Sequence, residues 1–100
     1  MVKHIVVLKL KESASGHSKT ENALLIKEKL ESLQGKIKGL VKIEVGIDFS
    51  NTESSSDVVL YSEFATRKDL EAYQEHPRHK SVMPFIMEAR CERRVVDYEV

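Results

Sequence analysis

The sequence predicts an α+β protein of βαββαβ design, with a four-stranded antiparallel sheet that carries its helices on one face. Two observations lead to this fold class. Four segments have the pattern of strands, and helical segments with capping motifs lie between the first and second and between the third and fourth. The chain has 100 residues, enough for one hydrophobic core, so we expect a single domain over residues 1–100.

The first strand is expected over residues 3–11, which are rich in β-branched side chains. Because successive side chains of a strand point to opposite faces, the segment divides into two sets. One face carries Val2, His4, Val6, Leu8 and Leu10, and the other carries Ile5 and Val7. Both faces are apolar at the middle of the strand, which is typical of a central strand covered on both sides.

A capping box predicts the start of the first helix. In Ser18-Lys19-Thr20-Glu21, the serine hydroxyl and the glutamate carboxylate can satisfy free N–H groups of the first turn. Apolar residues then recur at helical spacing in one stripe, formed by Ala23, Ile26, Leu30, Leu33 and Ile37. We expect this helix to end between Gly35 and Gly39.

The second and third strands have different patterns. Residues 40–49 alternate strictly between apolar and polar, which predicts an edge strand with one buried face. Residues 58–64 are apolar on both faces, which predicts a central strand. The polar run over residues 50–57 is expected to be the loop that joins them.

Prolines divide the second helical region. Thr66 is a suitable N-cap, and Asp69 in the first turn complements the helix dipole. Pro77 interrupts this helix, so we expect His76 to end its first piece. We place Pro84 in the first turn of a second piece and the final strand over residues 93–100.

Right-handed crossovers arrange these elements as a ferredoxin-like sheet. If the four expected strands are numbered in chain order, their order in the sheet is 4-1-3-2. The helices can cover only one face of this sheet. The other face then exposes Ile5, Val7, Val59 and Tyr61, each worth roughly 1.5–3 kcal/mol when buried. We expect a second copy of the same sheet to cover this apolar face, which gives a homodimer.

Composition excludes several classes of partner. The 16 basic residues balance the 16 acidic ones and the pI is near 6.9, so there is no electrostatic footprint for nucleic acid or an anionic membrane. The apolar run at the start is broken by Lys9 and is too short for a signal peptide or membrane span, which predicts a cytoplasmic protein. Cys91 is the only cysteine, so no internal disulfide can form.

The segment from Tyr73 to His79 is the densest group of proton-transfer side chains. An imidazole titrates near neutrality and a phenol can donate to a developing oxyanion, so the two could act on a carbonyl compound. The alternative is structural: His76 and Pro77 form a helix-ending turn, Tyr73 packs its ring, and His79 is solvated or binds a backbone carbonyl. The spacing leaves both interpretations open.

His4 is a lone imidazole on the strand face that also carries Val6 and Leu8. It is either a core histidine satisfied by one hydrogen bond or a group in a pocket. With His76 and His79 it could in principle bind a metal, but no HxH or HxxxH spacing supports such a site. We therefore expect no metal and no cofactor.

Four segments form a pattern: residues 2–11, Ile43-Glu44-Val45-Gly46, Leu70-Glu71-Ala72-Tyr73-Gln74-Glu75-His76-Pro77-Arg78-His79, and residues 95–100. In these segments the chain resembles the stress-responsive α/β-barrel family, also called Dabb proteins. The resemblance runs essentially end to end, and its most specific element is Ala72-Tyr73 with His76-Pro77 and His79.

The resemblance implies a dimeric α/β barrel in which two sheets face each other. It also implies a pocket between sheet and helices in each subunit, where a small hydrophobic molecule would meet His4, Val6 and Leu8, with His76 nearby. The specific activity is unknown for most such proteins. In one branch, the plant polyketide cyclases, a histidine and a tyrosine that match His79 and Tyr73 work without a cofactor.

Two functions therefore stand side by side. The first is a small dimeric protein that binds a hydrophobic molecule. The alternative is a cofactor-independent cyclase, lyase or isomerase that acts on a polyketide-like carbonyl compound through His79 and Tyr73. The first helix has no aromatic residue between Ser18 and Ile37, whereas the cyclases line their pocket partly with aromatics from that helix.

Overall fold

Four long strands form one antiparallel sheet in the computed structural model, which describes residues 1–100. The sheet order is β4-β5-β1-β6, and two short strands, β2 and β3, form a separate hairpin. The elements are β1 Val2–Leu10, β2 Ser13–Ala14, β3 His17–Ser18, α1 Lys19–Glu31, β4 Leu40–Ile47, β5 Val58–Phe64, α2 Arg67–Glu75, α3 Pro77–Ala89 and β6 Arg90–Glu99. The predicted fold class and strand order are confirmed, with β1 and β5 in the middle.

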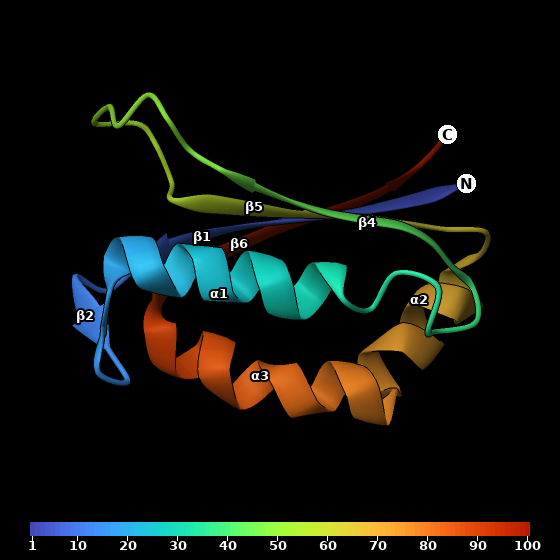
Figure 1. Ribbon diagram of the computed structural model, residues 1–100. Helices are drawn as coiled ribbons and strands as arrows, with labels where there is room; N and C mark the ends of the chain where they lie inside the picture. Colours follow the sequence, from blue (N-terminus) through green and yellow to red (C-terminus); the bar gives the residue numbers. More distant parts are fainter.

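The helices lie on one side of the sheet and leave the other side bare (Figure 1). The core fills the space between the two layers, where Leu8, Ile26 and Phe64 are fully buried. Burial of each such side chain contributes roughly 1.5–3 kcal/mol. None of the helices is both long and apolar enough to cross a membrane.

The bare side of the sheet carries an apolar cluster, which we call the open-face patch: Ile5, Val7, Val59, Tyr61, Val96 and Tyr98. Strand register brings these side chains together, because Ile5 lies between Tyr61 and Val96, and Val7 lies opposite Val59. Val96 and Tyr98 are exposed, and the other four are half-buried. The final strand thus adds two members to the four expected from the first and third.

The first helix is shorter than expected. It begins at the predicted capping box, in which Ser18 and Glu21 bond reciprocally. It ends at Glu31, with Ser32 as C-cap, rather than between residues 35 and 39. The apolar stripe nevertheless stays buried, because Leu33 and Ile37 pack into the core from the turns that lead to β4.

The expected role of Pro84 is wrong. His76 has an extended backbone (φ −67°, ψ 135°) that ends α2, and Pro77 takes the first position of α3. Pro77 suits that position because its fixed φ is helical and the N–H it lacks would be unpaired there anyway. Pro84 therefore lies inside a continuous α3, and β6 starts at Arg90 instead of residue 93.

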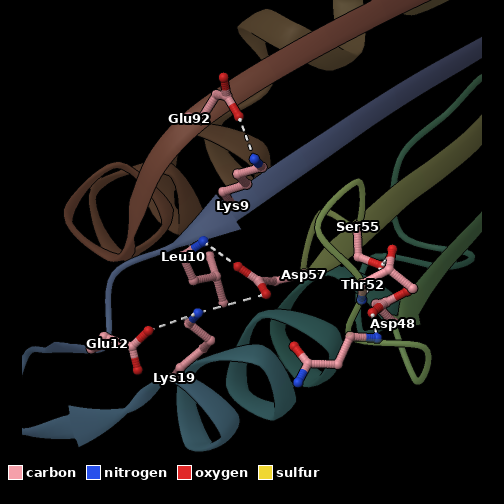
Figure 2. Close-up of polar contacts among 10 residues, drawn as sticks. Lys9, Leu10, Glu12, Lys19, Asp48, Thr52, Ser55, Asp57 and Glu92 are labelled. Atoms are coloured by element: carbon pink, nitrogen blue, oxygen red, sulfur yellow. Dashed lines mark hydrogen bonds and ion pairs between the residues drawn. The ribbon is translucent and has the colours of Figure 1, made fainter.

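Asp57 joins three elements at one end of the sheet (Figure 2). Its carboxylate accepts from the backbone N–H of Leu10 at 2.7 Å, and its own N–H donates to the carbonyl of Leu8 at 2.8 Å. Lys19, the first residue of α1, lies 3.8 Å from the same carboxylate. Asp57 therefore ends the predicted loop by fixing the start of β5 against the end of β1.

Gly39 packs against the first turn of α2, and its replacement tests that contact. A Cβ at Gly39 would lie 2.6 Å from the carboxyl of Asp69, which is itself held by the Thr66 hydroxyl at 3.0 Å. Gly35 has a similar positive φ, 79° against 88°, but open space around it. We expect Gly39→Ala to lower the free energy of unfolding by about 1–3 kcal/mol more than Gly35→Ala, since only Gly39 adds a steric clash to backbone strain. Urea denaturation of both variants measures the difference, and equal losses would contradict the contact.

Candidate functional site

A cavity of about 200 Å³ lies between the sheet and the helices. Ten of its 16 lining residues are hydrophobic: Val6, Leu8, Leu30, Ile43, Leu60, Tyr61, Tyr73, Met83, Ile86 and Met87. The polar lining residues are His4, Ser62, Gln74, His79, Arg90 and Arg93. A mostly apolar concave site with a few polar groups is the usual form of a small-molecule pocket.

The sheet side of the cavity contains His4, which the alternation of β1 places beside Val6 and Leu8. The residue is 7% exposed, and Nδ1 forms a hydrogen bond to the carboxylate of Asp97, its neighbour across the β1–β6 pair. A carboxylate accepts, so Nδ1 carries the hydrogen and Nε2 has no partner in the protein. Asp97 therefore fixes both the tautomer and the orientation of this imidazole.

The helix side contributes Tyr73 from α2. Its residue exposure is only 4%, and its ring lies 5.1 Å from the ring of Phe64, centroid to centroid. Tyr73 lines the cavity, and its hydroxyl forms no hydrogen bond to another protein group. Burial raises the pKa of Tyr73 to about 12, so the hydroxyl keeps its proton at neutral pH and can donate to a ligand.

His79 lies beside Tyr73, with the two ring centroids 4.4 Å apart. Its Nδ1 donates to the backbone carbonyl of Gln74 at 3.2 Å, which leaves Nε2 with a free lone pair in the neutral ring. Burial lowers the pKa of His79, and nearby positive groups, including Arg93, lower it further against the opposing effect of the Gln74 bond. At neutral pH this imidazole is therefore an unprotonated base at the cavity wall.

The structure brings five of the six candidate residues to one cavity: His4, Val6, Leu8, Tyr73 and His79. His76 is not among the lining residues. Its Nδ1 accepts from the backbone N–H of Arg78 at 3.1 Å, which caps the start of α3. No group of three His, Cys, Asp or Glu side chains has the arrangement of a metal site.

Sequence reasoning missed Asp97, Arg93 and Arg90 on β6, as well as the lining residues Ser62 and Gln74. Asp97 could have been found from the alternation, because antiparallel pairing of the first and last strands puts it opposite His4. Arg93 lies opposite Leu8 by the same register. Arg90 carried no such signal, because the register shifts between Lys9 and Leu10 and only the folded strand reveals this irregularity.

Comparisons with known proteins identify the family. The model of the stress responsive A/B barrel domain matches residues 2–100. A dimeric protein of unknown function and ferredoxin-like fold from Bacteroides fragilis is 36% identical, with a TM-score of 0.86, and the match covers 99% of this chain and 95% of that chain. A search of curated proteins gives no match.

More distant structures share the fold. A Dabb family protein from Mesorhizobium loti is 24% identical, with a TM-score of 0.74 over 99% of this chain and 95% of that chain. An antibiotic biosynthesis monooxygenase is 16% identical, with a TM-score of 0.70 over 100% of this chain and 98% of that chain. At these identities the likeness concerns the fold alone. The family match spans nearly the whole chain, and the chain therefore belongs to the stress-responsive A/B barrel domain family.

Proposed function

We propose that this protein is a homodimer in which each subunit binds a small hydrophobic molecule in the cavity between sheet and helices. The observation that carries the proposal is the combination of an apolar lining with unpaired polar atoms. Tyr73 offers a hydroxyl donor, and His79 and His4 each offer a free Nε2. These three atoms are accessible rather than sealed in the core, so a ligand with a polar group can bind them.

The dimer is supported by the open-face patch and by a relative. Six apolar or aromatic side chains gather on the face that no helix covers. Such a contiguous patch differs from the single, scattered apolar residues that are usual on the surface of a monomer. The Bacteroides fragilis protein, 36% identical, is described as dimeric. Pairing of two open faces would bury the patch of both copies around a twofold axis.

A charge within the open-face patch tests the dimer. Val7 belongs to the patch and lies opposite Val59, so Val7→Lys would place two lysines in a symmetric interface and weaken the dimer on the order of tenfold or more. Leu24→Lys is the matched control, because Leu24 is exposed on α1, on the helix layer. Sedimentation should show the wild type and Leu24→Lys at twice 11.4 kDa, and Val7→Lys shifted toward 11.4 kDa. A wild-type monomer, or an unshifted Val7→Lys, would contradict the proposal.

Ligand binding is tested with 2-octanone, a neutral apolar ketone. We expect saturable binding by isothermal titration calorimetry, with changes in the amide NMR signals of residues around the cavity. Met83→Trp should abolish binding because the larger ring fills the space beside Met83, which lines the cavity. Leu24→Trp, with the same added ring on an exposed position, should bind like the wild type. Equal binding by both variants would place the ligand elsewhere.

A second candidate function is a cofactor-independent cyclase, lyase or isomerase, favoured by the pairing of Tyr73 with His79. In such a reaction His79 Nε2 would take a proton from the carbon next to a carbonyl group. The electron pair of that C–H bond would move toward the carbonyl oxygen, and Tyr73 would donate a hydrogen bond to the developing enolate. Asp97 would hold His4 in place at the opposite wall.

Deuterium exchange at the α-carbons of 2-octanone in D2O measures this proton transfer. The enzymatic function predicts exchange above the buffer rate, reduced about 10²-fold or more in His79→Gln and in Tyr73→Phe. His17→Gln should retain the rate, because His17 lies in the β2–β3 hairpin and does not line the cavity.

The same exchange depends on pH in a predictable direction. Since burial lowers the pKa of His79 from its usual 6.5, the unprotonated base predominates at neutral pH and the rate is level there. As the pH falls through the lowered pKa, the ring gains a proton and the rate decreases. A midpoint above 6.5, or exchange that His79→Gln leaves unchanged, would exclude His79 as the base while leaving ligand binding intact.

A further inference from the structure

Two arginines of β6, Arg90 and Arg93, line the cavity without an ionic partner. Neither forms an ion pair, whereas Arg94, on the open face of the sheet, pairs with Glu92 at 3.1 Å. No aspartate or glutamate lines the cavity. A protein with equal numbers of acidic and basic residues thus has two arginines in the lining of this one cavity, and the adjoining carboxylate of Asp97 is bonded to His4 rather than to either arginine.

Strand register explains why both arginines reach the same cavity. Arg93 lies opposite Leu8, whose side chain belongs to the helix-covered face. Arg90 is three residues away and would point to the other face of a regular strand. The register shift between Lys9 and Leu10 instead sets Arg90 opposite Leu10, which is buried under the helices. A bulge commonly redirects a side chain in this way.

The arginines lie at the open end of the cavity. Arg93 and Met87 are exposed while Arg90 is half-buried, so the cavity opens between α3 and β6. The deeper wall is apolar, with Val6, Leu8 and Leu30 buried. Arg93 is also close enough to His79 for its charge to act on that ring. The site therefore has a cationic entrance, an apolar body, and Tyr73 and His79 within reach of the same ligand.

We propose that the ligand of this cavity is an amphiphilic anion, whose carboxylate or phosphate group binds Arg90 and Arg93 while its apolar chain occupies the interior. This inference rests on the proposed ligand-binding function and specifies its chemistry. Arginine suits the role, because its planar guanidinium binds carboxylate and phosphate oxygens through paired hydrogen bonds. The half-buried position of Arg90 strengthens such bonds relative to those of a fully solvated arginine.

Three eight-carbon ligands distinguish the contribution of the charged group to binding from that of the apolar chain: octanoate, octyl phosphate and the neutral 2-octanone. Calorimetry at low salt should give at least one anion a dissociation constant about tenfold or more below that of the ketone, since a hydrogen bond to a charged group is worth roughly 1.5–3 kcal/mol. The tighter of the two anions identifies the head group. The preference should shrink as salt is added, because Arg93 is exposed.

Charge-neutral variants assign the preference to these side chains. Arg90→Gln/Arg93→Gln should bind all three ligands with similar affinity. Arg94→Gln should keep the anion preference. This substitution removes the same charge from the same strand, but Arg94 lies on the opposite face of the sheet, across from Val7. Circular dichroism confirms that each variant is folded.

The failures of the two proposals are distinguishable. If 2-octanone binds and neither anion binds more tightly, the anionic ligand is wrong and the ligand-binding function stands. If the preference survives in Arg90→Gln/Arg93→Gln, these arginines are not its cause and the inference is overturned. If none of the three ligands binds, the ligand-binding function fails, and the inference fails with it.

Discussion

The alternation of side chains along β1 is the constraint on which the rest of the structure depends. This strand is paired on both sides, with β5 and β6, so its two faces cannot rotate relative to the sheet. One face supplies His4, Val6 and Leu8 to the core and the cavity wall. The other face supplies Ile5 and Val7 to the open-face patch. A shift of one residue would exchange these two sets and remove both surfaces at once.

Pairing of β1 with β6 also positions polar side chains of the site. His4 is oriented because Asp97 lies directly opposite on β6, and the unpaired Arg93 enters the cavity because it lies opposite Leu8. The helices contribute Tyr73 and His79 through the turn at Pro77, which sets α3 directly after α2. The site therefore combines polar side chains positioned by the sheet with a base and a donor at a helix junction.

The sequence predicted the type and order of the helices and strands better than the residues at which they begin and end. Helix-capping residues, strand alternation and crossover handedness suffice for the sheet order, because each depends on local chemistry or general chirality. Pro84 was misplaced since two prolines could each begin a helix, and only packing selects Pro77. The pairing of His79 Nδ1 with the Gln74 carbonyl and the orientation of Arg90 depend on local backbone geometry and a bulge, which no spacing in a single sequence encodes.

The central position of β1 has a consequence for how the protein acquires its fold during synthesis. β1 emerges from the ribosome before both of its neighbours. Its nearest partners in the sequence are Val58 of β5, opposite Leu8, and Arg90 of β6, opposite Leu10, so it must wait for at least 50 further residues. During that interval its two apolar faces and both hydrogen-bonding edges are unpaired. The strand that defines the cavity and the open face is thus also the segment most exposed to unwanted association, and α1 is the first element able to shield it.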